Sequence, residues 1–119
     1  MDAVSLETLQ TKKCLPCEGG VAPLSADAAK QWLTVIPKWT LSDDCKLISR
    51  KLNATNFLKA MKLLGQVAEV AEEQQHHPDL HLTGYRHVTI ELTTHAIGGL
   101  SENDFIVAAQ IEKLLAEDA

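Results

Sequence analysis

Residues 87–94 read HVTIELTT and form the most regular pattern in the chain. Apolar and polar side chains alternate along it, with Val88, Ile90 and Leu92 on one side and His87, Thr89 and Glu91 on the other. Such alternation predicts a half-buried strand, because successive side chains of a strand point to opposite faces. One face should pack on a core and the other should be polar, which is typical of an antiparallel sheet.

Three shorter strands are predicted around this one. A segment at 80–82 is followed by Gly84, which offers a turn into the strand at 87. Two further apolar segments, 39–41 and 46–52, flank the polar stretch SDDC. A polar stretch of this kind between two strands indicates a hairpin-like turn.

Helices are predicted where apolar residues recur at steps of three and four. Ser25 can cap a first helix, which should stop at Pro37. Thr55 is the expected cap of a longer second helix that Pro78 ends. Its apolar side is predicted to comprise Phe57, Met61, Leu64, Ala68 and Ala71.

A last helix should follow the glycine pair at 98–99. Ser101, with Asp104 three residues later, resembles a capping box with a shorter acid. The order is then helix, two strands, helix, two strands, helix. Because such short strands cannot bury their own faces, we expect an α+β fold in which a four-stranded antiparallel sheet carries three helices packed on one face.

A chain of 119 residues and 13.0 kDa is long enough for one core. Residues 1–24 lack sustained periodicity and end in Gly and Pro, so they are interpreted as a partly ordered N-terminal arm. Residues 25–119 are expected to form the single domain.

The charge pattern excludes several classes of function. Eleven Lys and Arg against sixteen Asp and Glu give a net charge of −5 without a basic stripe, which disfavours direct binding of nucleic acid. No apolar run approaches the roughly 18 to 20 residues that span a membrane. The first twelve residues contain no Arg and resemble no targeting segment, so a cytoplasmic protein is expected.

Cys14 and Cys17 lie in the segment CLPC near the start of the chain, and Cys45 is the third cysteine. A zinc site needs further ligands at suitable spacing, which Cys45 does not supply. A redox pair usually lies at the start of a helix that follows a strand. This pair is not at the start of a predicted helix and does not follow a predicted strand. The pair is far from the histidines along the sequence, so we expect it to be dispensable for chemistry.

The histidines are the strongest candidates for a functional site. In EEQQHHPDLHLTGY, at 72–85, Glu72 precedes His76 by one helical turn and should contact it. Pro78 then forces the chain out of the helix, which leaves His76 and His77 at a helix end. His95 ends the predicted strand at 87–94, where side chains often reach a pocket.

Two simpler interpretations remain open for these histidines. A histidine pair at a helix terminus can interact with the last carbonyls and the helix dipole. A metal site is the other interpretation, although the break at Pro78 spoils the four-residue step from His77 to His81 that a helical metal motif would use.

A wider pattern includes the same residues. The pattern begins at Glu72 and continues with HHP at 76–78, Tyr85, His95 and Asp104. The gaps between these positions are three, six, nine and eight residues. This pattern resembles the signature of the pterin-4a-carbinolamine dehydratases at every position. The resemblance extends to KKCLPCEGG, to the segment at Trp39 and to THAIGGLSENDF. Many relatives carry an aromatic residue two positions after the HHP proline, where this chain has Leu80.

The resemblance implies a reaction and its context. The substrate would be a 4a-hydroxytetrahydropterin released by an aromatic amino acid hydroxylase, and the product a quinonoid dihydropterin, in tetrahydrobiopterin recycling. By position, His76, His77 and His95 match the family's catalytic histidines. Glu72 and Asp104 match its acidic positions around the site, although Asp104 has an equal alternative as a helix-start residue.

Histidine suits a dehydration of this kind. Hydroxide is a poor leaving group, so the carbinolamine oxygen needs a proton while the ring nitrogens supply electrons and lose a proton. Imidazole titrates near pH 6.5, so one His can arrive charged and another neutral. We expect His76 and His95 to be the acid and base in unresolved order, and His77 to bind substrate or exchange protons. No cofactor or metal is expected.

The expected partners are the pterin and further copies of the chain. A small domain with three amphipathic helices has apolar surface that its own core does not bury, which favours a homodimer or a tetramer. Some members of the family also act as dimerisation cofactors of a homeodomain transcription factor. A coactivator role without essential catalysis is therefore the alternative function.

Overall fold

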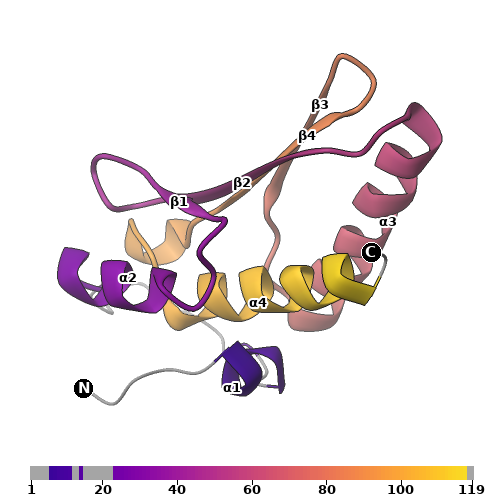
Figure 1. The fold of residues 1–119 in the computed structure, drawn as a ribbon. Helices are drawn as coiled ribbons and strands as arrows, with labels where there is room; N and C mark the ends of the chain where they lie inside the picture. The colour runs from indigo at the N-terminus through magenta and orange to yellow at the C-terminus, as the bar shows by residue number, and fades with distance from the viewer. Residues whose placement is uncertain (1–5, 12–13, 15–22, 118–119) are drawn as a thin grey trace.

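The structure, a computed structural model, describes residues 6–11, 14 and 23–117 (Figure 1). Its helices are α1 (Leu6–Thr11), α2 (Ala26–Leu33), α3 (Phe57–Gln74) and α4 (Glu102–Glu117). Its strands are β1 (Thr40–Leu41), β2 (Ile48–Asn53), β3 (Asp79–Thr83) and β4 (His87–Leu92), and a 3-10 turn covers His95–Ile97. From α2 onward the elements follow the predicted order. Within the described residues no helix is long and apolar enough to cross a membrane.

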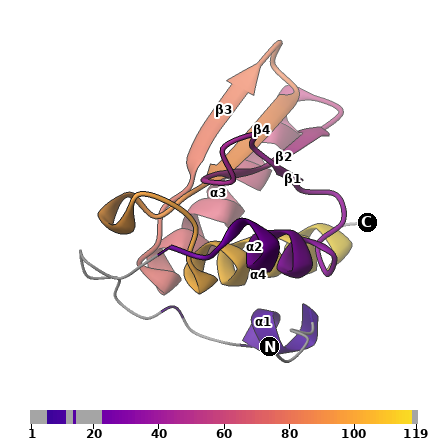
Figure 2. The same cartoon turned by 90° about the vertical axis from the view of Figure 1, so that its left-hand side faces the viewer.

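The four strands form one antiparallel sheet in the order β1-β2-β4-β3. The register places Ile48 opposite Leu92 and Leu80 opposite Ile90, so the apolar residues of neighbouring strands share one face. In Figures 1 and 2, α2, α3 and α4 lie on this side of the sheet. The predicted α+β fold is therefore confirmed.

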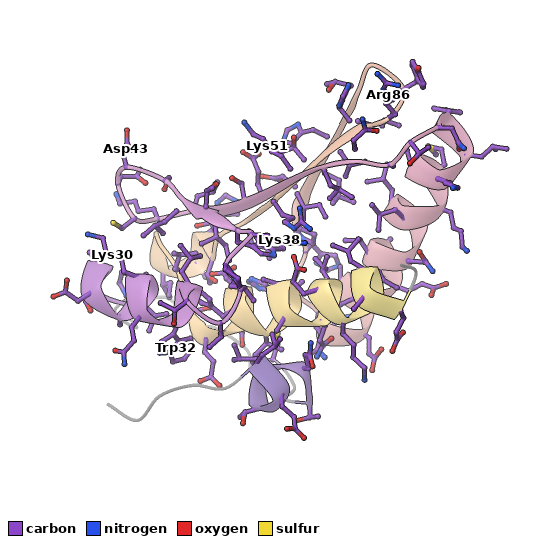
Figure 3. The ribbon with its side chains drawn as sticks, in the orientation of Figure 1. Lys30, Trp32, Lys38, Asp43, Lys51 and Arg86 are labelled. Atoms are coloured by element: carbon purple, nitrogen blue, oxygen red, sulfur yellow. The ribbon has the colours of Figure 1, made fainter. Side chains whose placement is uncertain are left out.

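The two faces of the sheet differ as the alternation at 87–94 predicts. Val88, Ile90 and Leu92 are at most 1% exposed and pack on the helices. The opposite face carries polar residues such as Lys51, which points away from α4 together with Arg86 of the β3–β4 turn (Figure 3). The sheet therefore has one covered and one open face.

The turn between β1 and β2 is built around Ser42, within the predicted SDDC turn. The Ser42 hydroxyl donates to Asp44 Oδ1 at 2.7 Å, and the Lys46 backbone N–H donates to the same oxygen at 3.1 Å. These two hydrogen bonds, the first above all, hold the pKa of the exposed Asp44 carboxyl below its ordinary value.

Helix α2 begins as predicted, with the Ala28 N–H donating to Ser25 Oγ at 3.1 Å. It leads to Trp39, which is 2% exposed at the centre of the core. The indole N–H donates to Glu112 of α4 at 2.8 Å, and Arg50 Nε donates to the same carboxylate oxygen at 2.8 Å. One acid thus satisfies two polar groups on the covered face of the sheet.

Helix α3 differs from the prediction in its cap. Asn56, not Thr55, is the N-cap, and its side-chain oxygen accepts the Lys59 N–H at 2.9 Å. Thr55 has a φ of 77° and cannot cap from this left-handed conformation.

The buried face of α3 also differs from the prediction. The buried residues are Ala60, Leu63, Val67, Ala71 and Gln74. Of the predicted side, Phe57 and Met61 are about half exposed, and Leu58 beside them is 80% exposed. The prediction failed because apolar residues occupy both sides of this helix, and packing on α4 and the sheet selects one of them.

Helix α1 lies in the segment interpreted as an arm and was missed by the sequence analysis. It packs on α4, on the side away from the sheet (Figures 1 and 2). Leu9 is fully buried, and Gln10 Nε2 donates to the Ala109 carbonyl at 3.3 Å. The boundary at residue 24 stays a prediction, and Cys17 lies outside the described residues.

Candidate functional site

The site begins where α3 ends. Gln75 adopts a left-handed conformation with φ 52°, its N–H donates to the Glu72 carbonyl at 3.3 Å, and the His76 N–H donates to the Ala71 carbonyl at 3.1 Å. This is the Schellman arrangement that terminates helices. The helix therefore ends at Gln74 rather than at Pro78, and both site histidines lie beyond it.

His76 is bonded to Asp104 from the start of α4. His76 Nε2 lies 2.6 Å from Asp104 Oδ1, and the two side chains are 13% and 0% exposed. The predicted contact between Glu72 and His76 is wrong, because Gln75 turns the chain away from the helix axis. Glu72 Oε2 instead lies 3.2 Å from Nε2 of His77 at the surface.

Asp104 is held by three groups. Its Oδ1 faces His76, while its Oδ2 accepts the Thr94 hydroxyl at 2.8 Å and the Ser101 backbone N–H at 2.9 Å. A buried carboxylate is costly unless such donors surround it. Asp104 therefore serves both roles that the sequence left open, as a helix-start residue and as a contact of the histidine.

The hydrogen bond with Asp104 determines which nitrogen of the His76 ring carries a hydrogen. An ionised carboxylate only accepts hydrogen bonds, so Nε2 must carry the proton that lies in this bond. In the neutral ring the lone pair is then on Nδ1, which has no hydrogen-bond partner among the described residues.

His95 reaches the site through its neighbour Thr94. Strand β4 ends at Leu92, earlier than predicted, and His95 opens the 3-10 turn. The Thr94 N–H donates to the Gly99 carbonyl at 2.9 Å, which closes a short loop that exposes the imidazole. Since Thr94 bonds Asp104 and Asp104 bonds His76, His95 directly follows a residue of the same hydrogen-bonded chain.

Other candidate residues are not brought into this cluster. His77 is exposed and points to Glu72. Tyr85, of the wider pattern, lies in the β3–β4 turn, at the opposite end of the hairpin from the histidines. Two strand residues outside the pattern, His81 and Glu91, pair at 2.6 Å on the open face of the sheet.

Within residues 6–11, 14 and 23–117, no group of three or more His, Cys, Asp or Glu side chains could hold a metal ion. Two hollows of about 450 and 320 Å³ are lined by described residues that include no histidine. The histidine cluster therefore lies outside both of these hollows.

Two buried polar residues of the site, Thr94 and Gln74, were not among the predicted site residues. Thr94 is 4% exposed and bonds Asp104, and Gln74 is 7% exposed and bonds the backbone of Cys14. The available signal for Gln74 was that it is a polar residue on the apolar side of the α3 pattern. The available signal for Thr94 was the alternation at 87–94, which puts Thr94 on the same side as Leu92 and Thr93 on the other side.

Comparisons with known proteins agree on one family. The family model described as pterin 4 alpha carbinolamine dehydratase matches residues 22–114. A relative from Halorhodospira halophila, named putative pterin-4-alpha-carbinolamine dehydratase, is 44% identical over 90% of this chain and 97% of its own. The Arabidopsis thaliana protein named pterin-4-alpha-carbinolamine dehydratase 2, mitochondrial, is 43% identical over 96% of this chain and 63% of its own.

A solved structure supports the same conclusion. The protein named transcriptional coactivator/pterin dehydratase from Brucella melitensis has a TM-score of 0.72 and 26% identity, over 77% of this chain and 97% of its own. The fold, the family match and the similar relatives all point the same way. This chain therefore belongs to the pterin-4a-carbinolamine dehydratases, a family of hydro-lyases.

Proposed function

We propose that the chain dehydrates a 4a-hydroxytetrahydropterin to the quinonoid dihydropterin, with His76 and His95 as its acid and base. The observation that carries the proposal is the hydrogen-bonded chain His76–Asp104–Thr94, which places one imidazole beside a buried carboxylate and the other next to Thr94. This chemistry needs a proton delivered to the leaving hydroxide and a proton removed from the ring.

The pairing favours the base role for His76. A buried carboxylate stabilises the imidazolium that forms when Nδ1 accepts a proton, as in other His–Asp pairs. The His95 imidazole is exposed and makes no side-chain hydrogen bond in the described part of the chain, so its proton can exchange with solvent between turnovers. It is the group proposed to protonate the leaving hydroxide. His77 and its neighbour Glu72 are proposed to bind the pterin.

The test is replacement of the histidines one at a time and together. His76→Ala and His95→Ala should each lower kcat by about two to four powers of ten, after subtraction of the uncatalysed reaction. The double variant should cost much less than the product of the single losses, because the groups act as a unit. His77→Ala should raise KM more than it lowers kcat.

His87 provides the control, since it is an exposed histidine on the open face of the sheet. His87→Ala should change turnover little. If it proved as damaging as His95→Ala, or if both His76→Ala and His95→Ala kept near-normal turnover in a stopped-flow assay with freshly generated carbinolamine, the proposed site would be wrong.

Rescue by added imidazole separates the two roles. In a His76→Gly variant, the rescued rate should rise with the fraction of neutral imidazole, because the missing group is a base. In a His95→Gly variant it should rise with the fraction of imidazolium. The opposite pattern in a rate-against-pH series would exchange the two assignments.

We further propose a physiological setting. The pterin would be supplied by an aromatic amino acid hydroxylase in the cytoplasm, so the reaction would serve tetrahydrobiopterin recycling. No cofactor or metal takes part in the proposed chemistry, since no electrons leave the substrate. Fractionation of the native cell with an antibody to the chain would test the location, and comparison of biopterin with other pterins as substrates would test the setting.

A second function is favoured by two observations. The Brucella relative is named a transcriptional coactivator as well as a dehydratase, and α3 exposes Phe57, Leu58 and Met61 to solvent. A protein-binding role through this helix is therefore the alternative. Recovery of a transcription factor from native extract by a protein that does not turn over carbinolamine would favour it over catalysis.

A further inference from the structure

Cys14 and the buried Gln74 are not used by the proposed reaction, yet they contact the segments that carry His76 and Asp104. The backbone N–H of Cys14 donates to Gln74 Oε1 at 2.7 Å, and the Cys14 thiol donates to the Asn103 carbonyl at 3.6 Å. We call these two bonds the Cys14 bracket. Gln74 is the last residue of α3, and Asn103 directly precedes Asp104.

The Cys14 bracket joins the same two elements as the catalytic hydrogen bond. The bond from His76 to Asp104 also runs from the residues after α3 to the start of α4. His76 is tied to the helix end through its own N–H, so a displacement of Gln74 carries the imidazole with it. The separation of the two elements therefore determines whether the 2.6 Å bond can form.

Gln74 is held on both sides of its amide. Its oxygen accepts the Cys14 N–H, and its Nε2 donates to Gln110 Oε1 of α4 at 3.1 Å. Gln74 is 7% exposed, so little water is available to replace a hydrogen-bond partner that its amide loses. Its conformation is thus determined by Cys14 and α4 together.

Pro23 and Leu24, directly before α2, contact the loop that carries His95. The Leu24 N–H donates to the Leu100 carbonyl at 2.8 Å. A Cβ placed on Gly99 would lie 2.8 Å from the side-chain Cβ of Pro23, so the proline ring packs against the Gly99 backbone in space that only glycine leaves free. Residues 14 and 23–24 thus contact the segments that carry His76, His95 and Asp104.

We propose that Cys14 and Gln74 are positioning residues of the active site, which together hold His76 against Asp104. The inference rests on the proposed function for its effect on turnover, although its effect on the His76–Asp104 bond is independent of that function. It also changes the expectation of dispensability for Cys14, because Cys14 is far from the histidines along the sequence but contacts Gln74 and Asn103 in space.

Two substitutions interrupt the Cys14 bracket at different atoms. Gln74→Met keeps the length of the side chain and removes both the amide oxygen and the amide nitrogen. Cys14→Val removes the thiol donor, whereas Cys14→Ser keeps a donor and should restore the wild-type behaviour. The matched controls are Gln31→Met on the exposed side of α2 and Cys45→Ser in the β1–β2 turn.

The readouts are the NMR resonance of the His76 ring N–H, steady-state kinetics and the circular dichroism of each variant. In Gln74→Met and Cys14→Val we expect the ring resonance to lose its downfield, hydrogen-bonded position, and kcat to fall about tenfold with KM within about twofold. The controls and Cys14→Ser should match the wild type. Cys14→Val decides the question if Gln74→Met does not fold.

Folded variants that keep the ring resonance of the wild type would overturn the proposal, whether or not kcat falls. A lost resonance with unchanged kcat would also overturn it, since the bond would then be unnecessary for turnover. A lost resonance in a protein whose wild type never turns over carbinolamine would instead refute the proposed function and leave the structural role of the Cys14 bracket intact.

Discussion

Asp104 is the residue on which the geometry of the site depends most. It is fully buried and accepts hydrogen bonds from His76, Thr94 and Ser101. The capping-box spacing and the wider histidine pattern both pointed to Asp104 in the sequence. The alternation that puts Val88, Ile90 and Leu92 on the covered face also puts Thr94 there, whereas Thr93 faces the other way and donates to the Lys46 carbonyl at 2.5 Å. The bond from Thr94 to Asp104 was not predictable, because it depends on how the chain after β4 meets the start of α4.

Thr94→Val is predicted to disturb both stability and turnover. It removes the hydroxyl while keeping the shape, which leaves Asp104 Oδ2 and the Ser101 hydroxyl each short of a partner. We expect the free energy of unfolding to fall by about 1–3 kcal/mol and kcat to fall about tenfold. Thr94→Ser should restore kcat. Denaturant unfolding and steady-state kinetics measure the two effects.

Thr93→Val is the matched control for this prediction. Its hydroxyl bonds a backbone carbonyl at the surface, so the substitution should cost less than about 1 kcal/mol and leave kcat unchanged. Equal effects of the two valine substitutions would show that the contact between Thr94 and Asp104 has no special role.

At the scale of the elements, strand β4 and the starts of α2 and α4 were predictable because local signals agreed there. The alternation at 87–94 and the capping residues Ser25 and Asp104 are all found in the structure. Helix α3 was predicted in position but not in orientation. Phe57 and Met61 form one apolar side and Leu63 and Val67 another, and periodicity cannot decide between them. Helix α1 was missed because a helix of six residues depends on packing against α4.

The start of α3 permits a direct comparison of the predicted and observed caps. Asn56→Ala should lower the free energy of unfolding by about 1 kcal/mol, because it removes the acceptor for the Lys59 N–H. Thr55→Gly should raise it by a few tenths to about 1 kcal/mol, because glycine adopts a φ of 77° without the strain of a β-branched residue. Thermal unfolding monitored by circular dichroism at 222 nm would test both predictions. A Thr55→Gly variant less stable than Asn56→Ala would show that Thr55 is the N-cap after all.

At the scale of the whole molecule, the exposed side of α3 predicts self-association. Phe57, Leu58 and Met61 lie together on a helix whose opposite side is already buried. A small domain gains stability by covering such a patch, and a second copy of the chain is the occupant that we propose. The proposed state is a homodimer, with a tetramer built from dimers as the alternative.

Light scattering should show a mass of at least two chains at micromolar concentration. Met61→Lys places a charge in the apolar stripe and should shift the protein towards 13.0 kDa, whereas Gln31→Lys on the exposed side of α2 adds the same charge elsewhere and should not. A wild-type protein found only at the mass of one chain would contradict the prediction.

The contact between α1 and α4 has a consequence for the synthesis of this protein. Gln10 and Ala109, whose side chain and carbonyl are hydrogen bonded, are 99 residues apart in the chain. Domains are made from the amino terminus onward, at about 5 to 20 residues per second. Helix α1 therefore has no docking surface until α4 has left the ribosome. Asp104 emerges at the same stage, so a nascent chain stalled before α4 should carry both neighbouring histidines and yet be unable to form the hydrogen bond between His76 and Asp104.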